Sequence, residues 1–152
     1  MKRAQDIIDE KGADLFTISA DATIQDAVKL MVAKKVGAVL VKKDDKIVGI
    51  WTERDFLRNS IVDSFDPTRA KIGDFMTKEL FTVESSENIY RMMDKFLGLR
   101  LRHLPVEKDG EIIGLLSAGD VIKAALHEKT KEFDELNEMV SWEYYENWRW
   151  SK

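Results

Sequence analysis

Asp55 and Asp120 are the side chains of this sequence best placed to do chemistry, because each follows a hydroxyl residue by three positions. Thr52 precedes Asp55, and Ser117 precedes Asp120. A carboxylate can accept hydrogen bonds from both hydroxyls of a cis-diol such as ribose, at roughly 1.5 to 3 kcal/mol for each charged bond. A hydroxyl at a helix N-terminus can face a phosphate. The same residues also match a capping box, which is the role that they favour when considered alone.

The two motifs belong to an internal repeat. Gly49 and Gly114 begin them 65 residues apart, so both copies have the pattern Gly-x-x-Thr/Ser-x-x-Asp. The same spacing aligns Leu15-Phe16-Thr17 with Leu80-Phe81-Thr82 without a gap. A repeat of this length indicates a duplicated structural unit whose two copies share one architecture.

Each copy is predicted to place its motif where a strand is followed by a helix. Apolar residues at helical spacing predict a helix over residues 22–35, with Asp21 as its N-cap. Residues 37–41 form a continuous apolar run that is typical of a buried strand, and residues 46–51 predict the returning strand. A second helix is expected over residues 53–62.

A short leading strand completes each copy, at residues 16–18 and 81–83. The dipeptide Asp109-Gly110 is a strong hairpin signal between the paired strands of the second copy. Each copy therefore has the order β-α-β-β-α, which makes the fold class α+β. Opening segments precede the leading strands, and the 65-residue spacing pairs Ile7 with Ile72 there.

Composition excludes several classes of function. The chain has 152 residues, which suit one compact object with a shared core, and 34% of them are charged, which favours a densely charged surface. A net charge of −4 argues against nucleic acid as a partner. The absence of cysteine excludes disulfides and thiolate metal sites and favours a reducing compartment.

We expect neither a signal peptide nor a membrane span, so the cytoplasm is the expected location. His103 and His127 lie too far apart in sequence to suggest a metal site. The residues offer no triad, no metal cluster and no acid/base pair of carboxylates, so we expect no enzyme activity.

The sequence resembles tandem CBS domains, the paired regulatory modules named after cystathionine β-synthase and also called Bateman modules. The resemblance rests on Gly73-Asp74-Phe75-Met76-Thr77, on Arg102-His103-Leu104-Pro105-Val106 and on the two Gly-x-x-Thr/Ser-x-x-Asp motifs. It is strongest to the short stand-alone bacterial members. It implies two repeats packed with pseudo-twofold symmetry, which bind an adenine nucleotide such as AMP, ADP, ATP or NAD, or S-adenosylmethionine, in clefts between them. Together with the duplication, it favours ligand binding over simple capping.

The resemblance also implies crossed clefts, in which the ribose aspartate of one copy faces strand-end residues of the other. The cleft of Asp120 would comprise Ser117, Gly119, Asp120, Lys11, Phe16, Thr17, Val36, Gly37 and Ala38. The cleft of Asp55 would comprise Thr52, Arg54, Asp55, Met76, Phe81, Thr82, Leu101, Arg102 and His103.

The two clefts are not expected to be equivalent. Arg54 supplies a guanidinium suited to phosphate, whereas its counterpart in the second copy is Gly119. Gly37 leaves room for a flat base, so we expect adenosine to be seated best over Asp120 and phosphate-rich ligands over Asp55. Several roles stay open: the rings of Phe16 and Phe81 suit a core position, and Arg102 and His103 suit either phosphate contact or a surface position.

The expected organisation is repeat 1 at residues 4–62, a connector at 63–71, repeat 2 at 72–127 and an aromatic-rich helical tail at 128–152. Three of the four tryptophans lie in the final eleven residues, which is typical of an interface anchor. We therefore expect a homodimer, with packing of the tail on its own domain as the alternative and a membrane-surface role disfavoured. The sensor would act on a regulated protein partner that the sequence does not name. The alternative is a constitutive dimeric scaffold or interaction protein whose capping boxes only resemble ribose sites.

Overall fold

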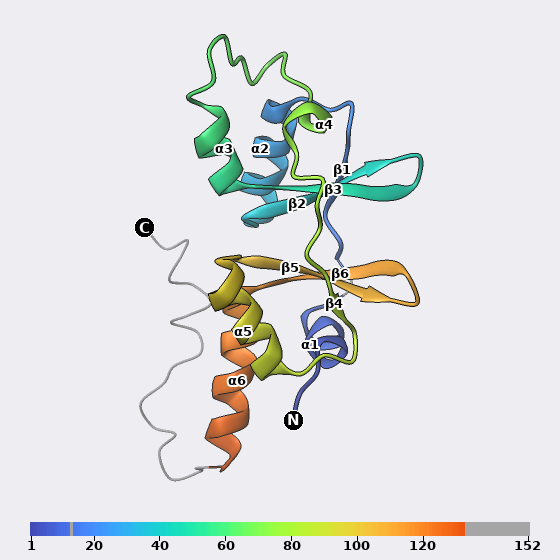
Figure 1. Ribbon diagram of the computed structural model, residues 1–152, viewed down its shortest axis with the longest axis vertical. Coiled ribbons are helices and arrows are strands. Elements are labelled where there is room, and N and C mark those ends of the chain that lie inside the picture. Colours follow the sequence, from blue (N-terminus) through green and yellow to red (C-terminus); the bar gives the residue numbers. More distant parts are fainter. Residues whose placement is uncertain (13, 133–152) are drawn as a thin grey trace.

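The structure is a computed structural model that describes residues 1–12 and 14–132, so the predicted tail beyond Glu132 lies outside the described residues. Two units, each with one sheet and its helices, stack along the long axis of the molecule (Figure 1). The elements are α1 (Ala4–Lys11), β1 (Thr17–Ser19), α2 (Ile24–Lys34), β2 (Ala38–Lys43), β3 (Lys46–Thr52), α3 (Glu53–Asn59), α4 (Ile72–Phe75), β4 (Val83–Glu84), α5 (Ile89–Leu99), β5 (His103–Lys108), β6 (Glu111–Ser117) and α6 (Ala118–Glu132). The predicted α+β class with two β-α-β-β-α repeats is confirmed.

The two sheets have the same topology, with orders β1-β2-β3 and β4-β5-β6. In each sheet the first pair of strands is parallel and the second pair is antiparallel. Both hairpin turns place two successive residues at positive φ, namely Asp44 and Asp45 at 50° and 61°, and Asp109 and Gly110 at 53° and 81°. Two positive φ values are what a type I′ turn requires, as the Asp109-Gly110 signal predicts.

The prediction of Asp21 as the N-cap of the first long helix is wrong. Thr23 is the N-cap of α2: its hydroxyl accepts a hydrogen bond from the Asp26 N–H at 3.1 Å, and the Asp26 carboxylate accepts one from the Thr23 N–H at 3.1 Å. This capping box satisfies two helix-end donors, whereas Asp21 has no acidic partner at the matching position. The hydrogen bond from the Thr23 backbone also lowers the pKa of Asp26.

The opening helix of each sequence copy packs on the sheet of the other copy (Figure 1). Ala4, Ile7 and Ile8 of α1 are buried in the second core, together with residues of β4, β5, β6, α5 and α6. Ile72 of α4 is fully buried in the first core. Backbone hydrogen bonds fix these contacts, with Ala4 N–H donating to Glu87 O and Ile72 N–H to Ala22 O, both at 2.8 Å.

These contacts correct the predicted register of the opening segments. Ala4 occupies the place of Ile72, a spacing of 68 residues, so the alignment of Ile7 with Ile72 at 65 residues is wrong. The pairing of Gln5 N–H with Ser85 O and of Gly73 N–H with Ala20 O shows the same shift. The cause is helix length: α1 has 8 residues and α4 has 4, so the first copy needs more chain before its leading strand.

The crossed packing explains the glycine of each motif. A Cβ at Gly49 would lie 2.5 Å from Met76 Sδ and 2.9 Å from the backbone oxygen of Thr77. A Cβ at Gly114 would overlap Cδ1 of Ile8, which is the equivalent contact in the other unit. These glycines therefore allow close approach of the opening segments and need no ligand to account for them.

Gly49→Ala is expected to destabilise the protein by about 1 to 3 kcal/mol, because the methyl group meets backbone as well as a side chain. Gly114→Ala is the matched control and should cost less, because the atoms nearest to the added methyl group are side-chain atoms of Ile8 and none of them is backbone. Urea unfolding of both variants measures the two values. A larger cost at Gly114 than at Gly49 would contradict this account of the packing.

Candidate functional site

Both motifs form capping boxes at the helices that follow them. The Thr52 N–H donates to Asp55 Oδ2 at 3.0 Å, and the Asp55 N–H donates back to Thr52 Oγ1 at 3.2 Å. In the second copy the Ser117 N–H donates to Asp120 Oδ2 at 2.7 Å, and the Asp120 N–H to Ser117 Oγ at 3.1 Å. The cap uses Oδ2 in both cases, so a carboxylate can cap its helix and still present Oδ1 to a ligand.

Gly37 and Arg102, which precede β2 and β5, anchor these helices to the sheets through their backbone oxygens. The Glu53 N–H at the start of α3 donates to Gly37 O at 3.0 Å, and the Ala118 N–H at the start of α6 donates to Arg102 O at 2.8 Å. Gly37 and Arg102 therefore occupy equivalent places in the two units. Their different side chains make the two clefts chemically unequal.

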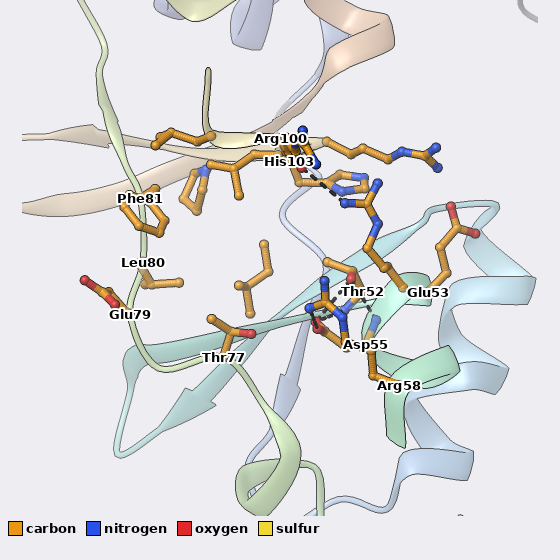
Figure 2. A pocket seen from close by; sticks show the side chains of 16 residues that line it. Thr52, Glu53, Asp55, Arg58, Thr77, Glu79, Leu80, Phe81, Arg100 and His103 are labelled. Atoms are coloured by element: carbon orange, nitrogen blue, oxygen red, sulfur yellow. Dashed lines mark hydrogen bonds and ion pairs between the residues drawn. The ribbon is translucent and has the colours of Figure 1, made fainter. Parts of the chain in front are cut away.

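A cavity of about 420 Å³ lies between the two units, over Asp55. The first copy contributes the end of β3 and the first turns of α3, and the second contributes the segment before β4, the end of α5 and the start of β5 (Figure 2). The lining residues are Ile50, Thr52, Glu53, Arg54, Asp55, Arg58, Thr77, Glu79, Leu80, Phe81, Leu99, Arg100, Leu101, Arg102, His103 and Pro105. Asp55 is buried, with 9% of its surface exposed, so its carboxylate faces an environment with little solvent.

Four arginines line this cavity. Arg54 donates from Nη1 to the backbone oxygen of Arg100 at 3.1 Å and so links α3 to the end of α5. The Nη1 atom of Arg58 lies 3.7 Å from Asp55 Oδ1. Figure 2 shows Arg58 and Asp55 on one side of the cavity and Arg100 and His103 on the other. Arg54 and Arg58 lie on α3 with Asp55, and Arg100 and Arg102 come from the other unit, so both units contribute guanidinium groups to a cavity with one buried carboxylate.

Part of the residue set predicted for the Asp55 cleft lines this cavity. Of the residues predicted for the Asp55 cleft, the structure brings to the cavity Thr52, Arg54, Asp55, Phe81, Leu101, Arg102 and His103. Met76 packs instead against the first core beside Gly49, and the Thr82 hydroxyl donates to Glu107 Oε2 at 3.2 Å.

Arg58 and Arg100 were missed as lining residues. A signal for Arg58 was present, because it follows Arg54 by four positions and so shares its helix face. Arg100 had no such signal, since its place depends on its left-handed backbone, with φ of 53°, at the end of α5.

The surroundings of Asp120, where the second cleft is predicted, are arranged differently. Lys11 Nζ forms an ion pair with Asp120 Oδ2 at 2.8 Å and also donates to Leu115 O at 3.2 Å. Gly119 is open, because a Cβ there would meet Ser117 Oγ at an ordinary 3.6 Å. The remaining residues predicted for this cleft belong to the first unit. Thr17 is the first residue of β1 and Phe16 precedes it, and Ala38 is the first residue of β2 and follows Val36 and Gly37.

Phe16 and Val36 have partners in the first unit. Lys34 Nζ lies 5.8 Å from the centroid of the Phe16 ring, a cation–π contact. Val36 packs against the first core. Their predicted contact with a base therefore remains a prediction.

Comparison with known proteins matches the CBS domain at residues 5–61 and again at residues 72–127. The chain belongs to the CBS-domain family. It is 40% identical over 131 residues to the CBS domain-containing protein CBSX3, mitochondrial, of Arabidopsis thaliana, and the match covers 83% of this chain and 64% of that protein. The chain therefore spans somewhat less than two thirds of this relative.

Solved CBS-domain structures share the fold. A CBS-domain containing protein from Agrobacterium tumefaciens is 33% identical, with a TM-score of 0.77 over 82% of this chain and 99% of that one. CBSX2 in complex with AMP is 28% identical, with a TM-score of 0.71 over 85% of this chain and 99% of that one. Structural neighbours of bacterial origin consist of a CBS pair and little else, as the sequence resemblance implies.

Two further observations bear on other classes of site. No helix within residues 1–12 and 14–132 is long and apolar enough to cross a bilayer. Over the same residues, no group of three or more histidine, aspartate or glutamate side chains gathers as a metal site would require.

Proposed function

We propose that this CBS-domain pair is a regulatory module that binds an adenine nucleotide in the cavity over Asp55. CBS-domain pairs are known nucleotide-binding regulatory modules, and AMP occupies CBSX2. The observation that carries the proposal is the cavity itself, which joins a buried carboxylate to four arginines in one space between the units. Such a space suits a ligand that has a diol at one end and phosphate at the other.

Each part of the ligand has a matching group in this proposal. Asp55 Oδ1 accepts hydrogen bonds from the ribose hydroxyls, because Oδ2 is already used by the cap. The arginines contact the phosphate oxygens, for which a planar guanidinium offers paired donors. The apolar side chains of Leu80, Phe81 and Leu101 cover the base. AMP, ADP, ATP and NAD share the adenosine half that these groups recognise.

Because residues of both units line the cavity, a bound ligand changes how the two units are positioned relative to each other. We propose that the module works as a homodimer in the cytoplasm and transmits occupancy as a change in dimer geometry or in contact with a regulated protein. The helices offer a surface for association: Leu57 on α3 and Leu97 on α5 are 71% and 77% exposed, and both helices lie on the same side of the sheets (Figure 1). Exposed apolar side chains on one face are typical of an interface.

The same apolar surface supports a second candidate, a constitutive dimeric scaffold whose Asp55 serves only as a helix cap. The two candidates differ in whether a nucleotide stabilises the folded state. They make the same prediction for self-association, so ligand binding is the property that separates them.

A saturating adenine nucleotide is expected to raise the melting temperature of the full chain. A ligand that binds only the folded state stabilises it by about 2.7 kcal/mol at a hundred times its Kd. Thermal unfolding with AMP, ADP, ATP and NAD measures the effect, and GMP and GTP are the controls for binding of ribose and phosphate without adenine. An unchanged melting temperature with every adenine nucleotide at millimolar concentration would favour the scaffold.

A further inference from the structure

Lys11 places a cation beside Oδ2 of Asp120. Oδ2 of Asp55, the corresponding oxygen in the other cleft, has no such cation among the described residues. Its ammonium lies 2.8 Å from Asp120 Oδ2 and 3.2 Å from the backbone oxygen of Leu115. In the Asp55 cleft the described partners of Oδ2 are the N–H and hydroxyl of Thr52. Arg58 approaches Oδ1 there only to 3.7 Å, and its side chain is 70% exposed.

Lys11 is held at this place by the docking of α1 on the second unit. Ile7 and Ile8 bury their side chains in the second core, and the Lys2 N–H donates to Glu128 of α6 at 2.6 Å. Lys11 stands in the last turn of α1, where the helix dipole favours a cation. The ammonium therefore reaches Asp120 from a helix that is fixed at both ends.

The ion pair changes what Asp120 can accept. Oδ2 receives three donors: the Ser117 N–H at 2.7 Å, the Ser117 hydroxyl at 2.8 Å and the Lys11 ammonium at 2.8 Å. A carboxylate offers about four acceptor positions over its two oxygens, so this oxygen is fully used. Oδ1 remains for the ribose hydroxyls, as at Asp55, but the ammonium at 2.8 Å neutralises more of the carboxylate charge that strengthens those hydrogen bonds than Arg58 does at 3.7 Å.

We propose that Lys11 lowers the affinity of the Asp120 cleft for nucleotides by pairing with Asp120 and neutralising part of its charge, so that the two clefts differ in affinity and the Asp55 cavity fills first. This inference rests on the proposed function and adds the residue that makes the nucleotide affinities of the two clefts differ. It reverses the expectation that adenosine is seated best over Asp120. Lys11 is a specificity-determining residue in this account, because it selects which of two related clefts accepts the ligand.

Lys11→Met removes the charge and keeps an unbranched side chain with good helix propensity. Asp55→Asn in the same full chain weakens AMP binding in the Asp55 cavity, so that AMP binding at the Asp120 cleft can be measured by calorimetric titration. In that background, Lys11→Met is expected to tighten AMP binding about three- to tenfold, since a partly exposed ion pair contributes modestly. Addition of Asp120→Asn should remove the gain.

Lys2→Met is the matched control. Lys2 lies two residues before the same helix and also makes an ion pair, with Glu10 at 2.7 Å, but its ammonium is not paired with Asp120. It should leave AMP affinity unchanged, and Lys11→Arg should preserve the low affinity because it preserves the cation.

The outcomes separate this inference from the proposed function. Lack of tightening in Lys11→Met overturns the inference, whether or not the parent chain binds AMP. Equal affinity at both clefts of the parent chain also overturns it. Binding at the Asp120 cleft of Lys11→Met, together with no binding by the parent chain, supports the inference and counts against the Asp55 cavity alone.

Discussion

Asp55→Ala is expected to weaken AMP binding by about a hundredfold or more. The substitution deletes two charge-assisted hydrogen bonds to ribose, each of roughly 1.5 to 3 kcal/mol. Asp55 is the buried carboxylate in the lining of the 420 Å³ cavity, whereas Glu53 and Glu79 are exposed, so the effect should exceed that of either glutamate. Calorimetric titration of parent and variant with AMP measures the change.

Asp120→Ala is the control for this experiment, because it removes the equivalent capping box and leaves the Asp55 cavity intact. Both variants should lose about 0.5 to 2 kcal/mol of stability, the usual cost of a lost cap. Only Asp55→Ala should lose most of its affinity for AMP. If Asp55→Ala binds AMP as tightly as the parent chain, the ribose assignment is wrong and Asp55 only caps α3.

Ile72→Ala is expected to lower the free energy of unfolding by about 2 to 5 kcal/mol, the range for truncation of a buried isoleucine. Ile72 is 0% exposed and fills the core of the first unit, although it belongs to the second sequence copy. The loss should therefore appear in the first unit. Urea unfolding gives the total cost, and hydrogen exchange of the β2 and β3 amides locates it.

Ile61→Ala is the matched control, since Ile61 is 84% exposed and should change stability by less than about 0.5 kcal/mol. Faster exchange confined to β5 and β6 in Ile72→Ala would contradict the crossed packing. It would place the opening helix on its own sequence copy.

The sequence predicted the elements whose signals are local. The motif residues Thr52 and Asp55, the Asp109-Gly110 turn and the paired strands all follow from short patterns, and the structure has each of them where its pattern lies. Their accuracy has a physical reason: capping and tight turns depend on residues within three or four positions of each other.

The features that the sequence did not predict depend on tertiary packing. Ile7 and Ile72 are identical residues at the repeat spacing of 65. Because α1 is one turn longer than α4, the residue that is structurally equivalent to Ile72 is Ala4. Lys11 was expected in the Asp120 cleft, but nothing in the sequence shows that its ammonium would contact the carboxylate itself. The cavity at Asp55 likewise includes Arg100, which the end of α5 turns toward the other unit.

The crossed position of α1 also bears on synthesis at the ribosome. Lys2 and Lys11 find their partners on α6, which lie 126 and 109 residues further along the chain. At about 5 to 20 residues per second, α1 emerges roughly 5 to 25 s before α6. Ile7 and Ile8 remain without their core during that interval, so the nascent chain carries two uncovered isoleucines that a chaperone can recognise until the second unit closes over them.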